Sequence, residues 1–190
     1  MNNIVIITGS PGVGKSTMIR SIAEGGKYNI INVGTFMLDI AMKEGIVKDR
    51  DELRFLNKDV VRKLQDRTFT DIAKMEGKII LDTHASVESN GRFVPGVPFD
   101  TMRIIKDNIH GIIYIDALTE EIMKRAMGDT KRTRNTDEAF IDAQRGINLS
   151  ILSMYSTYLN IPLYVIFNRQ DRLDEGVKSL GEHLEQIFSE

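Results

Sequence analysis

A glycine-rich stretch, GSPGVGKST at Gly9 to Thr17, follows the mostly apolar run Ile4 to Thr8. It satisfies the pattern G-x-x-x-x-G-K-[ST], in which glycines let the backbone turn so that successive N–H groups point at a polyphosphate. Lys15 would add a positive charge for the terminal phosphates, and the Ser16 hydroxyl would bind Mg²⁺. Because the motif stands after a strand and before a helix, we predict a nucleotide site rather than an incidental glycine-rich turn. The predicted nucleotide contacts are Gly9, Ser10, Pro11, Gly12, Val13, Gly14, Lys15, Ser16 and Thr17.

A second apolar run, Ile79 to Leu81, ends in Asp82. An acid at the end of such a strand in a P-loop protein predicts a carboxylate that holds Mg²⁺ directly or through water. The alternative is an aspartate that caps a loop. His84 follows two residues later, where it would contact a phosphate or the water around the metal, although a single loop histidine also serves structural roles.

A polar segment with three cations, Gly128 to Asn135, lies between two expected helices, and Arg145 follows in the second of them. Phosphoryl transfer needs positive charge on the equatorial phosphate oxygens and exclusion of water. We therefore predict that Arg132, Arg134 and Arg145 act on the transferred phosphate, the first two from a short lid at about residues 128–136. The alternative is a solvated charged loop.

A possible acceptor region begins just past the second expected strand, at Gly34 to Ala41, and is followed by DRDELR after a glycine turn. A helical excursion over about residues 34–75 would close over a second substrate, with Thr35 and an arginine as polar contacts. The alternative is an amphipathic helix pair that only packs.

Short apolar runs alternate with longer amphipathic stretches, which is typical of βα units and a mostly parallel sheet in one α/β domain over residues 1–190. We predict strands at Asn3–Thr8, Tyr28–Val33, Lys78–Thr83, Gly111–Asp116 and Pro162–Phe167, all rich in Ile and Val. We predict helices from Lys15 to about Glu24, around Phe36 to Ala41, over Asp49–Glu76, from Thr119 with its hydroxyl as cap, and over Asp137–Tyr158 and Asp171–Phe188. Glycine, asparagine and proline in Ala85–Pro98 predict a loop.

The composition excludes several classes of protein. The 190 residues are 42% hydrophobic and 27% charged with a net charge of −2, so no global basic field attracts nucleic acid or anionic membrane. The absence of cysteine excludes disulfides and thiolate metal sites. Apolar runs are far shorter than the roughly 20 residues that span a bilayer, and the N-terminus does not read as a signal peptide. We expect a cytoplasmic protein.

With these pieces in place, the sequence resembles the archaeal-type adenylate kinases, the small-lid branch of the nucleoside monophosphate kinases. The matching stretches are TGSPGVGKST, NVGTFMLDIAMKEGIVKDRDELR, ILDTH followed by GRFVPGVP, GDTKRTR and FNRQDRLDEGV, in the family's order. The resemblance implies a three-layer P-loop fold with a five-stranded parallel sheet and helices on both faces. It also implies Mg²⁺-dependent phosphoryl transfer from ATP to AMP, and a homotrimer.

The resemblance assigns roles to matched positions. It places Gly9 to Thr17 on ATP, Asn168 near adenine, Asp82 at the metal side, and Arg132, Arg134 and Arg145 on the transferring phosphate. Asp39 stands where the better-known bacterial-type enzymes carry an arginine for the AMP phosphate, and ILDTH lacks the Gly-Phe-Pro-Arg that follows there. Arg50 and Arg54 are the predicted substitutes, with Thr35 and His84 as further AMP contacts.

Three alternatives remain open at the level of sequence. The acceptor could instead be CMP, UMP or a small metabolite hydroxyl, because a kinase for any of these would have the same sheet, loop and lid. A GTPase is suggested by Asn168-Arg-Gln-Asp171, which echoes N-K-x-D, but Arg replaces Lys and LDTH replaces D-x-x-G. An RNA- or protein-binding ATPase is disfavoured by the near-neutral charge.

Overall fold

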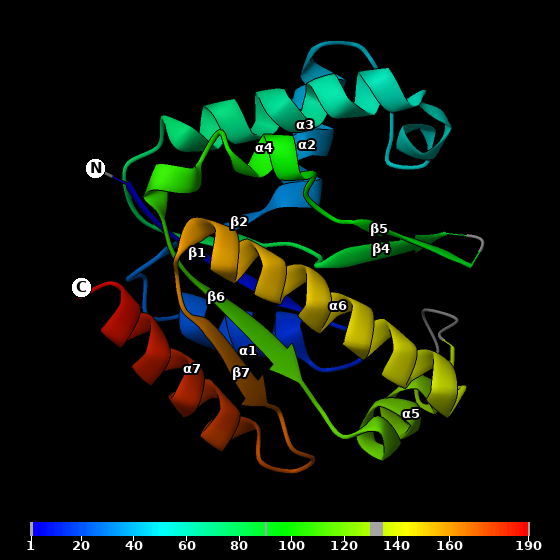
Figure 1. Cartoon of the computed structure of the whole chain (residues 1–190), viewed down its shortest axis with the longest axis vertical. Helices are drawn as coiled ribbons and strands as arrows, with labels where there is room; N and C mark the ends of the chain where they lie inside the picture. The colour runs from blue at the N-terminus through cyan, green and yellow to red at the C-terminus, as the bar shows by residue number, and fades with distance from the viewer. Residues whose placement is uncertain (1, 90, 130–134, 190) are drawn as a thin grey trace.

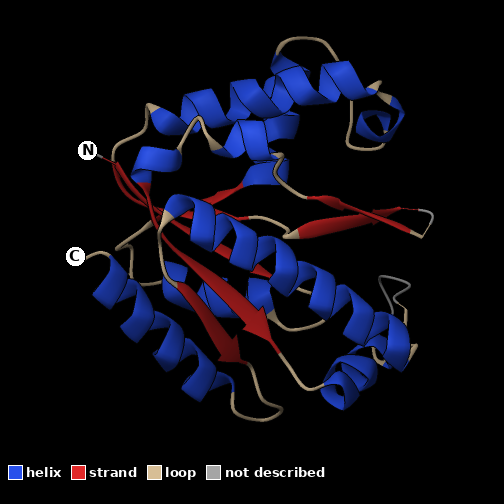
Figure 2. Ribbon diagram, in the orientation of Figure 1, coloured by secondary structure: helices blue, strands red, loops and turns tan. Residues whose placement is uncertain are grey.

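The core of the protein is a parallel sheet of five strands. The computed structural model describes residues 2–89, 91–129 and 135–189. The strands are β1 (Asn2–Gly9), β2 (Asn29–Asn32), β3 (Gly77–Asp82), β6 (Ile109–Asp116) and β7 (Leu163–Phe167). They pair in the order β2-β3-β1-β6-β7. Figure 2 shows the strands in red between helices in blue. The prediction of a five-stranded parallel sheet is therefore confirmed, with each strand at its expected place.

Helices cover both faces of this sheet. They are α1 (Lys15–Ala23), α2 (Val33–Lys43), α3 (Lys58–Ala73), α4 (Phe99–Met102), α5 (Thr119–Met127), α6 (Glu138–Leu159) and α7 (Leu173–Ile187), with 3₁₀ turns η1 (Glu52–Phe55) and η2 (Lys106–Asn108). Ile4 and Ile6 of β1 share a buried cluster with α3, α4 and α6, whereas Val5 and Ile7 share another with α1 and α7. Figure 1 shows α3 and α4 on one side of the sheet and α1 and α7 on the other. The alternation explains why strands covered on both faces read as continuous apolar runs. Among the described residues, no helix combines the length and the apolar character needed to cross a membrane.

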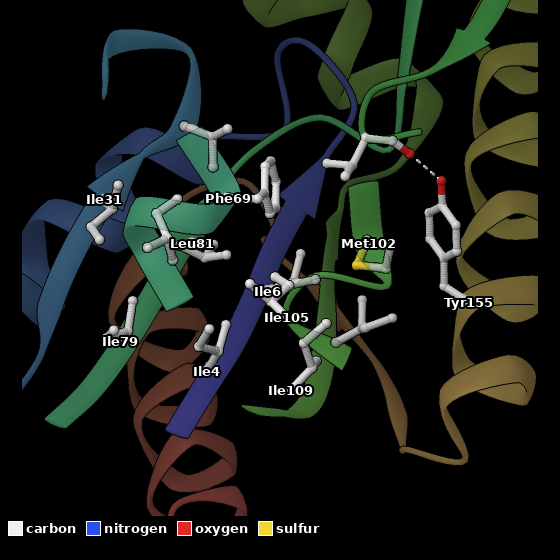
Figure 3. Close-up of a cluster of buried hydrophobic side chains, with 14 of the residues drawn as sticks. Ile4, Ile6, Ile31, Phe69, Ile79, Leu81, Met102, Ile105, Ile109 and Tyr155 are labelled. Carbon is white, nitrogen blue, oxygen red and sulfur yellow. Dashed lines mark hydrogen bonds between the residues drawn. The ribbon is translucent and has the colours of Figure 1, made fainter. Parts of the chain in front are cut away.

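One of the two clusters joins the sheet to the segment that follows the β3 end. Figure 3 shows Ile4, Ile6 and Phe69 packed together beside Met102, with Tyr155 of α6 at the rim. The hydroxyl of Tyr155 donates a hydrogen bond to the Val97 carbonyl, and burial raises the pKa of this phenol to about 12. The bond ties α6 to the chain that carries the predicted site residues after β3.

The direction in which the chain leaves the sheet reverses between β1 and β3, which predicts a ligand site there. These strands are adjacent, but α1 follows β1 on one face of the sheet and α4 follows β3 on the other. In open α/β sheets such a reversal leaves a crevice at the carboxyl ends of the strands, where ligands bind. The glycine-rich loop and Asp82 both stand at this edge.

The predicted helix over Asp49–Glu76 is wrong in its first part. Residues 49–57 form turns and η1, and α3 begins after Asn57, whose side chain accepts a hydrogen bond from the Val60 N–H at 2.9 Å. The Asp49 carboxylate accepts from the N–H groups of residues 51 and 52 in the same way. Local bonds from these short polar side chains compete with helix formation, and α3 begins only after its N-cap Asn57.

Two further predictions need correction. The segment Ala85–Pro98 is not all loop but holds an antiparallel hairpin, β4 (Ser86–Ser89) and β5 (Arg92–Pro95), which extends from the main sheet in Figure 1. Gly91 at its tip has a φ of 73°, as tight hairpin turns require, so the glycine that predicted a loop marks the turn of a hairpin. The Thr119 hydroxyl does not cap α5, because Thr119 is already its first residue and donates to Asp142 at 2.7 Å.

Gly96 anchors the return of this hairpin, and we expect its replacement by alanine to destabilise the protein. Its N–H donates to the Ala85 carbonyl at 2.9 Å, and an added Cβ would overlap the backbone carbonyl of His84. Such overpacking costs about 1–3 kcal/mol, and each kcal/mol lowers the melting temperature of a chain this size by about 2–4 °C. Calorimetry of G96A against G146A, an exposed α6 glycine with open space around it, tests this. Equal melting temperatures would contradict the expectation.

Candidate functional site

The glycine-rich loop has the backbone that its sequence requires. Gly12 and Gly14 have φ values of 90° and 87°, in the left-handed region that other residues seldom adopt. An added Cβ on Gly14 would overlap the side-chain amide of Asn168, and one on Gly9 would lie 2.5 Å from the Ile115 carbonyl oxygen. Gly14 also precedes α1 as its N-cap, so the loop leads directly to a helix N-terminus, which favours anions.

Ser10 of the loop faces the protein interior. Ser10 is only 5% exposed. Its Oγ lies 2.8 Å from the Tyr114 hydroxyl and accepts a hydrogen bond from the Asn148 amide at 3.1 Å. The hydroxyl of Ser86 in β4 donates to the other end of Asn148 at 2.6 Å. This buried polar network fixes the loop to β6, α6 and the hairpin, so any contact of Ser10 with a nucleotide would use its backbone.

Lys15 and Asp82, predicted to act in one site, are in direct contact. The Lys15 ammonium donates to one carboxylate oxygen of Asp82, and each side chain is only 11% exposed. Burial lowers the pKa of the Lys15 ammonium to about 8. The other carboxylate oxygen accepts from the Asn32 amide at 2.8 Å. The carboxyl ends of β1 and β3 thus hold a lysine that a phosphate could draw away from its carboxylate.

The oxygen donors at this edge fit Mg²⁺ bound together with a nucleotide. Asp82 supplies a carboxylate, and Ser16 lies exposed in the first turn of α1 with a hydroxyl. Within the described ranges, no three His, Cys, Asp or Glu side chains gather in a cluster that could hold a metal. Mg²⁺ binds through one or two protein oxygens plus substrate phosphates and waters, so these donors match it.

The acceptor-side residues Thr35 and Arg50 are also brought together. Thr35 donates to the Asn32 side-chain oxygen from both its N–H and its hydroxyl, each at 3.0 Å. The Arg50 guanidinium donates to the Thr35 hydroxyl at 3.0 Å, and both residues are exposed. Arg54 lies in η1, and its side chain falls outside the described part of the structure. His84 is exposed and lines a hollow of about 380 Å³ together with the start of the loop.

The three arginines predicted to act on the transferred phosphate fall into two groups. Arg132 and Arg134 lie outside the described residues. Arg145 holds the end of β6: its guanidinium bonds the carboxylates of Asp116 at 2.7 Å and Asp142 at 2.6 Å, and the carbonyl of Ala117 at 2.8 Å. Its action on the transferred phosphate therefore stays a prediction and would require some of these bonds to exchange.

Asn168, which follows β7, contacts the glycine-rich loop through its side chain. Its amide donates to the Val13 carbonyl at 2.8 Å, and its backbone N–H donates to the Asp116 carbonyl at 2.8 Å. Arg125, which sequence reasoning missed, donates to the carbonyls of Val13 at 3.3 Å and Asn168 at 2.9 Å. With Thr17 they line a second hollow, of about 410 Å³. Asn32 and Asn148 were missed as well, because their partners come from distant segments.

Comparison with known proteins identifies the family of this chain. Residues 8–140 match a family described as AAA domain. The adenylate kinase of Methanoculleus marisnigri is 35% identical over 185 residues, which cover 93% of this chain and 95% of that protein. The adenylate kinase of Pyrococcus abyssi is 34% identical and covers 100% of this chain and 99% of its own length.

The fold is also found in solved structures whose sequences differ strongly from this one. The shikimate kinase of Bacteroides thetaiotaomicron, at 14% identity, matches with a TM-score of 0.55 over 96% of this chain and 98% of its own. This likeness shows that the two chains share a fold. Because the sequence similarity to the archaeal enzymes extends over nearly the whole of both chains, the protein belongs to the adenylate kinase family.

Proposed function

We propose that this chain catalyses the reversible transfer of a phosphoryl group from ATP to AMP, giving two ADP. The observation that carries the proposal is the full-length similarity to enzymes named adenylate kinase. The geometry supports it, because a glycine-rich loop with Lys15 and a pair of polar residues, Thr35 and Arg50, lie at one edge of the sheet. A triphosphate and a monophosphate could therefore meet there.

On the donor side, the loop amides and the N-terminus of α1 would bind the phosphates of ATP, and the hollow beside Arg125 and Asn168 would hold its adenine. Ser16 and Asp82 would hold Mg²⁺, which when bound neutralises charge on the β- and γ-phosphate oxygens. Lys15 would exchange its bond with Asp82 for the phosphates, because a polyphosphate offers more negative charge than one carboxylate.

The transfer itself needs positioning and charge rather than a covalent intermediate. An oxygen of the AMP phosphate attacks the γ-phosphorus of ATP, the bond to the bridging β–γ oxygen breaks, and that oxygen leaves on ADP. Lys15 and the arginines 132, 134 and 145 would stabilise the charge that spreads over the transferred group, and the lid would exclude water. The attacking oxygen is already ionised, so no general base is required.

For the AMP phosphate we propose Arg50 as the cation, with Arg54 as a second. The guanidinium of Arg50 is exposed and is oriented by the Thr35 hydroxyl. Arginine can bind a phosphate through two parallel N–H bonds, which suits it to hold a monophosphate in line with ATP. His84 would complete this side of the site.

An assay of ADP formation tests the function. We expect ATP with AMP to form two ADP per turnover and the reaction to require Mg²⁺. The kcat/KM for AMP should exceed the kcat/KM for CMP or UMP by at least about tenfold, since mispaired polar groups in a base pocket cost a factor of this size or more. A CMP or UMP preference would assign another acceptor. GTP hydrolysis without stimulation by any acceptor would contradict the kinase proposal.

The family also supports proposals on the state of the chain. We propose a single catalytic domain over residues 1–190, a cytoplasmic location and a homotrimer of this 21.5 kDa chain. Analytical ultracentrifugation with the purified protein would test the trimer, and a monomer or dimer at micromolar concentration would contradict it.

A further inference from the structure

A continuous chain of polar contacts joins the donor and acceptor sides of the site, and Asn32 stands at its centre. Lys15 bonds Asp82, Asp82 accepts from the Asn32 amide at 2.8 Å, and the Asn32 oxygen accepts from Thr35 at 3.0 Å. Thr35 in turn accepts from Arg50 at 3.0 Å. The chain runs from the loop lysine to the acceptor-side arginine without a gap.

The strand register explains why Asn32 can reach both sides. Asn32 and Asp82 are the last residues of the neighbouring parallel strands β2 and β3, and they are direct partners in the pairing. Their side chains therefore leave the same face at the same level. Asn32 is also the N-cap of α2, so its oxygen must accept from the Thr35 backbone N–H at 3.0 Å.

The chemistry of the partners fixes the orientation of the Asn32 amide. A backbone N–H can only donate, so the oxygen of Asn32 must face Thr35. An ionised carboxylate can only accept, so the NH₂ group must face Asp82. One side chain thus holds a carboxylate with one end and a helix N-terminus with the other, which an alanine or an aspartate could not do.

We propose that Asn32 is a positioning residue that couples the binding of the two nucleotides, an inference that rests on the proposed function. When ATP draws Lys15 away, the Asn32 amide still holds one oxygen of Asp82 in place. A bound monophosphate would order Arg50 and Thr35. Because Thr35 bonds Asn32 and Asn32 bonds Asp82, it would order those two side chains as well. The first nucleotide bound therefore removes part of the ordering cost for the second, and exposed groups such as Asn32, Thr35 and Arg50 have such a cost to remove.

The test measures this coupling directly. The affinity for AMP is determined by calorimetry on the full chain, without and with a saturating non-hydrolysable ATP analogue and Mg²⁺, so that no turnover occurs. We expect the analogue to tighten AMP binding to the wild type by about fivefold or more. In N32A and in N32D the factor should fall to near one, because N32D keeps an oxygen for the Thr35 N–H but cannot donate to Asp82.

Asn57 offers a matched control on the next helix. It caps α3 with an equivalent bond to the Val60 N–H at 2.9 Å but forms no part of the contact chain described above. N57A should therefore lose a helix cap of the same kind and keep the wild-type coupling. Should N32A fold poorly, N32D with its cap intact gives the same answer.

The outcomes separate the two proposals. Undiminished coupling in N32A and N32D, equal loss in N57A, or a wild type that binds AMP without any coupling would overturn the role of Asn32 and leave the kinase function standing. A wild type that does not bind AMP with or without the analogue would overturn both.

Discussion

Replacement of Lys15 by alanine should lower kcat for ADP formation by about 10²-fold or more, the effect of losing one preorganised donor at the transferred group. The Lys15 ammonium is held beside Asp82 at the carboxyl ends of β1 and β3, with 11% of its side chain exposed, so water cannot readily replace its charge. K15A also leaves Asp82 with the Asn32 amide but without its cation. Steady-state kinetics at saturating ATP and AMP measure the change.

Lys27 provides a control for the loss of a lysine. Its side chain is 65% exposed and pairs with Glu185 on the surface at 2.9 Å. K27A should leave kcat within about twofold of the wild type, since surface ion pairs contribute little. A K15A enzyme with kcat near that of K27A would remove Lys15 from the mechanism.

The largest effect on stability is expected from replacing Arg145. Its partner Asp116 has only 3% of its side chain exposed, so R145M leaves a buried carboxylate without a cation. Breaking such a pair costs about 3–5 kcal/mol, and because Arg145 itself is 22% exposed we expect the lower end, about 3 kcal/mol. The melting temperature should then fall by about 6–12 °C, as measured by calorimetry.

A second substitution separates the structural role of Arg145 from its predicted catalytic one. The double variant R145M/D116N has no buried charge to compensate, and we expect it to recover at least half of the lost melting temperature. If Arg145 also acts on the transferred phosphate, kcat stays low in this restored protein. Recovery of both quantities would limit Arg145 to holding the end of β6, and recovery of neither would contradict the pairing as the source of the stability loss.

The fold could be predicted largely because its signals are local. The strands of a sheet covered on both faces are unbroken apolar runs, and the glycine-rich motif lies within nine consecutive residues. Lys15 and Asp82 could be assigned to one site in advance because each stands near the carboxyl end of a parallel strand, and these ends meet at one edge, but their direct contact was not predicted. The hairpin was missed because the same Gly, Asn and Pro residues mark turns of a hairpin and of an open loop.

Much of the site depends on contacts that no local pattern reveals. Arg145 was expected on a phosphate, but its neighbours include Asp116, 29 residues earlier in the chain. Asn148 is one of several polar residues in a long helix, and only packing brings it to Ser10. Asn32 would have been found by asking which side chain stands beside Asp82 in the next strand, a question that needs the strand register.

The strand that ends in Asn32 lies at the margin of the sheet and is four residues long. It is bonded to a neighbour on one side only, so its amides should exchange with deuterated solvent sooner than those of central β1. Fraying there would disengage Thr35 and Arg50 from Asp82 while the remaining four strands stay paired. A protein sample could thus show native secondary structure and a normal melting temperature while its acceptor-side residues, Thr35 and Arg50, are no longer aligned with Asp82.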